Sequence, residues 1–223
     1  MPGTDTATIA AIEPATARWM VSVVLSDGRR VGCKQRQVEA LGIAEGMALF
    51  PGMLDELLQA ERALAYETAM RRLARKERTE AELRQELATY GFGEECITGA
   101  LDRLRRERAI DDRRAAEGHL ARRTRQGDRG RRLLQAELRA RGVPGDVSDA
   151  LTAELDDDAA ALEAARRRGS RASLESYHAF ESAVGPYLLR RGFGMDVARR
   201  AMREVYPELV AESGRSDTRY PQL

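Results

Sequence analysis

The sequence predicts a mainly α-helical protein: a tandem array of three three-helix repeats behind a small N-terminal β-hairpin module. Three observations predict this fold. Aromatic residues make up only 5% of the 223 residues and charged residues 33%, with Ala, Leu, Arg and Glu prominent, which is typical of surface-rich helices and not of a β-sandwich. One Leu-x-x-x-Gly pattern recurs three times at intervals of about fifty residues. A β-branched apolar run near the N-terminus supplies the hairpin.

The first 52 residues are expected to form a tail and a small module. Residues 1–16 are rich in Thr and Ala without periodicity, so we expect a flexible tail there. Within the module, residues 17–52, the apolar run 19–25, a Ser-Asp-Gly turn and a returning segment at 30–34 predict a β-hairpin. Residues 35–41 predict a short helix. Because an isolated hairpin is marginally stable in water, this module should pack on the helical body or on the tail.

Helical periodicity begins at residue 53. Between residues 53 and 75, leucines and alanines return at three- and four-residue steps, as a helix with one buried face requires. Thr79 and Glu82 have the spacing of a capping box, which predicts the start of a second helix. We divide the rest of the chain into repeat 1 (53–111), repeat 2 (112–155), repeat 3 (156–206) and a C-terminal tail (207–223).

Each repeat is predicted to contain two helices, a glycine turn and a third helix. The recurring pattern is Leu87, Gly91 and Phe92; Leu138, Gly142 and Val143; and Leu188, Gly192 and Phe193. Glycine ends each middle helix where a left-handed backbone is needed. The first helices of repeats 2 and 3 are expected at 112–126 and 156–168, and the third helices near Glu94, Asp146 and Asp196.

Two further expectations concern the array. A repeat of about fifty residues is small for independent stability, so neighbouring repeats should share surface in an elongated or curved array. In repeat 3, Gly185 and Pro186 fall inside the middle helix, where proline removes a backbone donor and crowds the preceding turn. We expect a kink or a restart there.

Three segments within about residues 63–206 resemble a known family. They read LRQELATYGFGEECITGALDRLRRERAIDD, RRLLQAELRARGV and YLLRRGFGMDVARRAM, and they look like the successive repeats of RecX regulatory proteins. The double Asp at 111 and 112, the Arg-Gly-Phe of repeat 3 and the fifty-residue spacing together carry the resemblance. The sequence departs from the family pattern after the double Asp, where Ala115 and His119 replace aromatic residues, and in the loop Asp128-Arg129-Gly130.

The resemblance implies a function. RecX proteins are negative regulators of the RecA recombinase, which bind in the groove of the RecA–DNA filament and inhibit its ATPase, coprotease and strand-exchange activities in recombination, DNA repair and the SOS response. The implied partner is the RecA filament, with single- or double-stranded DNA as a further contact. We expect a monomer without a cofactor that acts in the cytoplasm.

The basic residues point to an acidic or phosphate-bearing partner. Lys34 and Lys76 are the only lysines among 37 basic residues, and Arg makes bidentate contacts with carboxylates and phosphates that Lys does not. GC-rich coding would produce the same bias. Ten arginines fall between residues 113 and 142, against three acids: Arg113, Arg114, Arg122, Arg123, Arg125, Arg129, Arg131, Arg132, Arg139 and Arg141.

This concentration predicts a salt-sensitive binding surface on repeat 2. The alternative is a solvated helical face paired with acids of neighbouring repeats. Arg166, Arg167 and Arg168 form a second candidate, although cations in a last helical turn also complement the helix dipole. We interpret Arg190 and Arg191 mainly as such capping residues. The acidic run 156–158 is interpreted as a helix start, or else as a contact for a basic partner surface.

The sequence shows no catalytic centre. It has no phosphate-binding glycine loop ending in Lys-Ser/Thr and no nucleophile elbow. His119 and His178 are isolated, so packed or helix-face histidines are favoured over metal ligands, and the spacing of Cys33 and Cys96 suggests neither a zinc site nor a disulfide. No run of eighteen apolar residues occurs, so we expect no membrane span. The competing function is a direct DNA-binding regulator with helix-turn-helix-like repeats.

Overall fold

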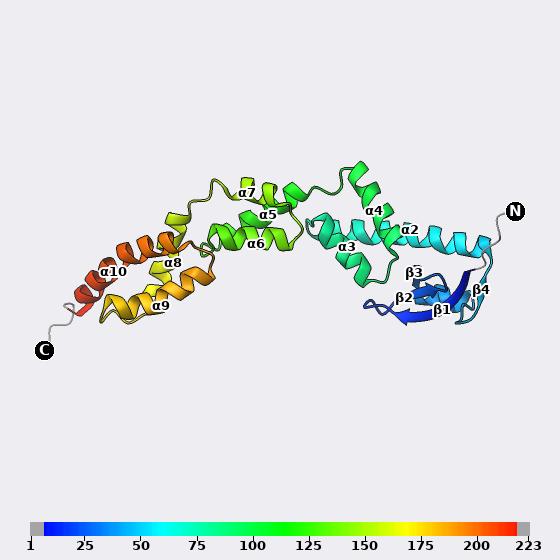
Figure 1. The fold of residues 1–223 in the computed structure, drawn as a ribbon, viewed down its shortest axis with the longest axis horizontal. Helices are drawn as coiled ribbons and strands as arrows, with labels where there is room; N and C mark the ends of the chain where they lie inside the picture. Colours follow the sequence, from blue (N-terminus) through cyan, green and yellow to red (C-terminus); the bar gives the residue numbers. More distant parts are fainter. Residues whose placement is uncertain (1–6, 218–223) are drawn as a thin grey trace. The chain divides into compact units, whose positions relative to one another are not determined.

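The computed structural model describes residues 7–217, which form two compact units (Figure 1). The first unit ends at Ala115 and the second begins at Ala116. The first contains a small sheet and α1 to α4, and the second contains α6 to α10. Helix α5 (Asp112–Thr124) begins in the first unit and ends in the second. The mainly helical fold with an N-terminal strand module is therefore confirmed.

The N-terminal module is a four-stranded antiparallel sheet with the strand order β3-β2-β1-β4. Its strands are β1 (Ala7–Pro14), β2 (Met20–Leu25), β3 (Arg30–Lys34) and β4 (Ala48–Leu49). The predicted hairpin is β2 and β3. The predicted tail is wrong for residues 7–14, because β1 pairs along β2 and buries Ile9, which is 1% exposed. Residues 1–6 of that tail lie outside the described residues.

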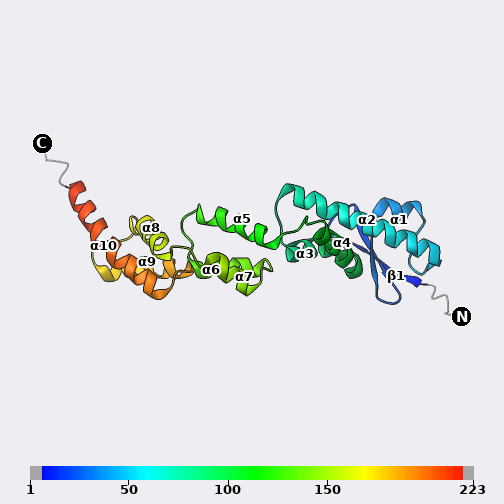
Figure 2. The same cartoon turned by 90° about the horizontal axis from the view of Figure 1, so that it is seen from above.

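Helix α2 (Pro51–Arg75), the first helix of repeat 1, also contacts the sheet. It runs along the sheet, with the short α1 (Gln35–Ala40) beside β3 (Figures 1 and 2). One carboxylate oxygen of the buried Glu61 accepts the backbone N–H groups of Gly32 in β3 and Gly93 in repeat 1, both at 2.7 Å. Burial raises the pKa of Glu61, and the two hydrogen bonds oppose that rise. A single side chain thus joins both parts of the first unit.

Nine helices make up the three repeats of the described chain. Repeat 1 contains α2, α3 (Glu80–Thr89) and α4 (Glu94–Arg106); repeat 2 contains α5, α6 (Arg131–Ala140) and α7 (Gly145–Thr152); repeat 3 contains α8 (Asp157–Gly169), α9 (Tyr177–Arg190) and α10 (Met195–Asp217). The capping box is confirmed, because the Glu82 N–H donates to the Thr79 hydroxyl at 3.2 Å and the Thr79 N–H to the Glu82 carboxylate at 3.0 Å. The boundaries that we draw between repeats remain our interpretation.

The same glycine turn ends the middle helix of every repeat. Gly91, Gly142 and Gly192 have φ values of 88°, 83° and 86°. In each turn the N–H of the following apolar residue donates to the carbonyl of the helical leucine five residues before it, at 3.3, 3.1 and 3.2 Å in repeats 1, 2 and 3. This is a Schellman turn, which satisfies helix-end carbonyls and leads the apolar residue back to the core.

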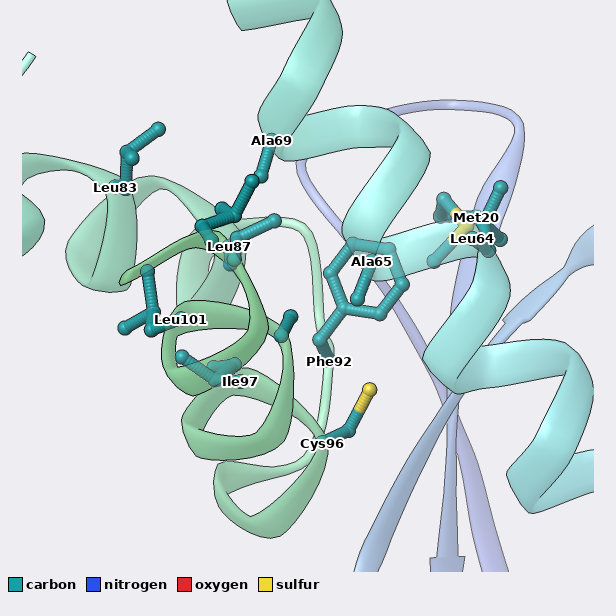
Figure 3. Packing of buried hydrophobic residues seen from close by; sticks show 12 residues of the cluster. Met20, Leu64, Ala65, Ala69, Leu83, Leu87, Phe92, Cys96, Ile97 and Leu101 are labelled. Carbon is teal, nitrogen blue, oxygen red and sulfur yellow. The ribbon is translucent and has the colours of Figure 1, made fainter. Parts of the chain in front are cut away.

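The repeats differ in the size of their cores. In repeat 1, Phe92 faces Ala65 of α2, with leucines of α3 and α4 around it (Figure 3). Repeat 3 is built around Phe180 and Phe193. The core of repeat 2 is the smallest and has no aromatic residue; its buried members are Ala116, Leu120, Leu134, Leu138 and Val143. Repeat 2 consequently buries the least apolar surface of the three and gains the least from it.

Repeat 3 bears on two expectations. Helix α9 is continuous through Gly185 and Pro186, so of the expected kink or restart the restart does not occur, and the kink stays a prediction. Helix α10 continues through Pro207 to Asp217, so the predicted tail is wrong for residues 207–217, and residues 218–223 lie outside the description. Tertiary contacts explain the continuation, because Leu209 packs on the core and Glu208 pairs with Arg166 of α8.

Candidate partner-binding surface

A carboxylate in repeat 2 neutralises part of the positive charge of the predicted binding surface. Glu137 of α6 accepts hydrogen bonds from Arg123 at 2.9 Å and from Arg129 at 2.7 Å. It also contacts Nε2 of His119 at 2.8 Å. Arg129 is only 17% exposed in its side chain, so this arginine belongs to the interior of the repeat. These two arginines hold α5, α6 and the loop between them together and are not free for a partner.

His119 is part of the same network and is electrically neutral. The residue is 7% exposed, and Nδ1 of its ring lies 2.7 Å from a guanidinium nitrogen of Arg141. Because arginine can only donate, Nδ1 accepts and Nε2 donates to Glu137. Burial lowers the pKa of His119, and the charge of Arg141 lowers it further. The hydrogen bond to Glu137 raises this pKa, but the net shift is downward. Burial raises the pKa of Glu137, but His119, Arg129 and Arg123 outweigh burial and hold that pKa below its ordinary value.

The stability of repeat 2 should therefore fall in mild acid. The folded state keeps His119 neutral while the unfolded chain takes up a proton below about pH 6.5, so the unfolded state binds more protons as the pH falls. We expect the free energy of unfolding to decrease by at most about 1.4 kcal/mol per pH unit in this range. Urea unfolding at pH 7.5, 6.5 and 5.5 measures this. The variant His119→Gln should lose this part of the pH dependence and His178→Gln should keep it; equal slopes in both would contradict the assignment.

Other arginines of the predicted set also have partners. Arg114 pairs with Glu77 at 3.0 Å, and Arg139 pairs with Asp149 at 2.8 Å. Arg131 donates to the Leu155 carbonyl at 2.7 Å. Arg113 is engaged as well. Seven of the ten positions therefore have contacts, when Arg123, Arg129 and Arg141 are included. Of these ion pairs, only that of Arg114 with Glu77 joins repeat 2 to an acid of a neighbouring repeat, as the alternative interpretation expected.

Three arginines of repeat 2 remain, and we call them the free arginines. Arg122 and Arg125 lie at the end of α5 and in the turn after it, and Arg132 lies in the first turn of α6. The side chains of all three are exposed and make no hydrogen bond or ion pair with the residues that the structure describes. Arg122 lies in the last turn of α5, and Arg125 follows the helix end directly. Of the ten arginines in the predicted binding surface, the free arginines are the ones whose side chains are available to a partner.

The three arginines of the second predicted group, residues 166–168, have different surroundings. Arg166 binds Glu208 through both carboxylate oxygens, at 2.9 and 3.2 Å. Arg167 donates to the backbone carbonyls of Gln126 and Gly127. Only Arg168 is exposed without such a contact among the described residues, and it lines a hollow with Arg190 and Arg191. The sequence favoured a capping role for the last two, since nothing in it showed that the ends of α8 and α9 meet.

The described residues offer no site for a metal. They contain no group of three His, Cys, Asp or Glu side chains that could hold an ion. Cys33 and Cys96 are buried free thiols, and burial raises the pKa of each to about 12. In the part of the chain that the structure covers, no helix is long and apolar enough to cross a membrane.

Comparison with known proteins decides the family. A model described as "RecX, first three-helix domain" matches residues 65–104. The regulatory protein RecX of Amycolatopsis mediterranei is 35% identical over 63% of this chain and 82% of that protein. The chain belongs to the RecX family. The RecX protein of Geobacillus thermodenitrificans is 31% identical over 70% of this chain, which spans 59% of the length of that relative.

A solved structure supports the fold of this RecX family member. The crystal structure of a regulatory protein RecX superposes with a TM-score of 0.60 at 21% identity, over 86% of this chain and 97% of that one. The family model covers α3 and nearly all of α4, together with part of α2. The free arginines of repeat 2 lie outside that matched segment.

Proposed function

We propose that this RecX family member is a negative regulator of the RecA recombinase. It binds in the groove of the RecA–DNA filament and inhibits the ATPase, coprotease and strand-exchange activities of RecA in recombination and DNA repair. Membership of a family of regulatory proteins carries this proposal. The chain acts by binding and not by catalysis, and it works as a cytoplasmic monomer.

The repeat structure supports a filament as the partner. Three repeats with the same glycine turn follow one another along the chain, and a filament offers equivalent sites in succession. The free arginines add a positive charge that carboxylates and phosphates attract, with a strength that falls as salt rises. The binding of the chain to the filament is therefore expected to be salt-sensitive.

Direct DNA binding is the second candidate. It is favoured by the helix, glycine turn and helix of α6 and α7, with the exposed Arg132 in the first turn of α6. Paired helices of this kind occur in DNA-binding proteins. Tight, sequence-dependent retention on duplex DNA without RecA would favour this candidate over filament binding.

A pull-down tests the proposal. RecA is assembled on immobilised single-stranded DNA with a nonhydrolysable nucleotide, and retention of the chain is compared with free RecA and with bare DNA. We expect retention mainly on the assembled filament, and a lower rate of ATP hydrolysis and of strand exchange when the chain is added to active RecA. Unchanged rates of both reactions at a stoichiometric excess of the chain would overturn the proposal.

A further inference from the structure

A basic hollow of about 530 Å³ lies in the second unit. It is formed by the C-terminal turn of α8, the residues after it, the C-terminal end of α9, and Asp128 of the loop between α5 and α6. Apart from Ser170, Tyr187 and Asp128, every lining side chain is an arginine: Arg167, Arg168, Arg171, Arg190 and Arg191. We call this the arginine hollow.

The positive charge of the arginine hollow is poorly compensated. Five arginines less one aspartate leave a formal charge of +4. Arg191 pairs with Asp128 at 3.0 Å and lies over the Tyr187 ring at 5.1 Å from its centre. The side chains of the three exposed members, Arg168, Arg171 and Arg190, make no hydrogen bond or ion pair with any described residue.

Helix dipoles offset only part of this positive charge. The C-termini of α8 and α9 each carry a partial charge of roughly −0.5, so together they offset about one of the four positive charges. About three charges remain in a small volume, where their mutual repulsion is relieved only by counter-ions from the solvent or by a bound anion.

The lining favours phosphate over an acidic protein segment. A docking peptide buries apolar anchors at the centre of its interface, and the arginine hollow has no aliphatic side chain to receive them. Planar guanidinium groups instead match the oxygens of phosphate with paired hydrogen bonds. We infer that the arginine hollow binds phosphate groups, carried either by a nucleic-acid backbone or by a free phosphorylated ligand. This site is separate from the free arginines of repeat 2 and needs no RecA.

Two double variants of the full chain test the inference. Arg168→Ala with Arg190→Ala removes two unpaired cations of the hollow. Arg199→Ala with Arg203→Ala, two exposed arginines of α10 outside the hollow, removes the same charge from the same repeat. Binding of a fluorescent single-stranded oligonucleotide is titrated at several salt concentrations without RecA. We expect the hollow variant to bind about tenfold more weakly at low salt. The negative slope of log affinity against log salt should become less steep by about 1.4.

The control variant should stay within about twofold of the unmodified chain. Thermal unfolding establishes that both variants are folded. Calorimetric titration with pyrophosphate then separates the two sources: binding that the hollow variant loses identifies a free phosphorylated ligand, and oligonucleotide binding alone identifies a nucleic-acid backbone. The inference is overturned if no phosphate probe binds, if the control loses as much affinity as the hollow variant, or if a polyglutamate peptide displaces the oligonucleotide from the same arginines.

Discussion

Reversing the charge of the three free arginines together, as Arg122→Glu, Arg125→Glu and Arg132→Glu, is expected to remove most of the inhibition of RecA. Six units of charge change on side chains that are exposed and unpaired within the described chain. Placing acids where the partner presents carboxylates or phosphates costs several kcal/mol, so we expect the affinity for the filament to fall about a hundredfold or more. The concentration that halves the ATPase rate of RecA measures this effect. Stability should change little, because exposed positions without contacts usually tolerate substitution within about 0.5 kcal/mol.

A charge-matched control keeps this test specific. Arg36, Arg75 and Arg106 of the first unit are also exposed arginines without an ion pair among the described residues. Reversing these three introduces the same change in net charge away from repeat 2. We expect the control to retain inhibition within a few-fold, with a weaker salt dependence than the unmodified chain. If the control loses as much as the repeat 2 variant, or if the repeat 2 variant still inhibits, repeat 2 does not provide the main contact.

The sequence predicted the features that local physics controls. The capping box at Thr79 and Glu82 and the left-handed glycines depend on a few adjacent residues, and both are confirmed. Strand β1 escaped prediction because residues 7–14 have no clear alternation, and their conformation depends on pairing with β2. Helix α10 passes Pro207 because contacts with α8 outweigh the lost hydrogen bond.

The candidate site was predicted only in part, for a different reason. Counting charges located the basic region, but pairing depends on the fold. Glu137 of α6 binds Arg123 of α5 and Arg129 of the loop between the two helices, so their charges are compensated within the repeat. Charge counting also missed the arginine hollow. Arg168 and Arg190 are 22 positions apart in the sequence, and they line the same hollow only because the fold brings the ends of α8 and α9 to it. Net charge over a segment is therefore a poor guide to the charge that a partner meets.

Gly192→Ala is expected to be the most disruptive single substitution in the second unit. The left-handed backbone at this position, with φ of 86°, costs alanine about 1 kcal/mol or more. In addition, an added Cβ would collide with the backbone nitrogen and the Cβ of Leu133 and lie 2.9 Å from its Cα. Backbone cannot move aside as a flexible side chain can, so overpacking adds about 1–3 kcal/mol. We expect a loss of about 3 kcal/mol, measured by urea unfolding.

The added Cβ of Gly192→Ala would also disturb the contact between repeats 2 and 3. The Gly130 N–H donates to the Arg191 carbonyl at 2.8 Å, so the glycine turn of repeat 3 is bonded to the start of α6 in repeat 2. Gly127→Ala is the matched control, because Gly127 also has a left-handed backbone (φ 64°) in the same unit, but its nearest neighbours are the ends of the flexible Glu163 and Arg167 side chains. It should cost only the backbone strain of about 1 kcal/mol. Equal losses in the two variants would mean that glycine at 192 is required by its turn alone, and that close contact between repeats 2 and 3 contributes nothing to the requirement.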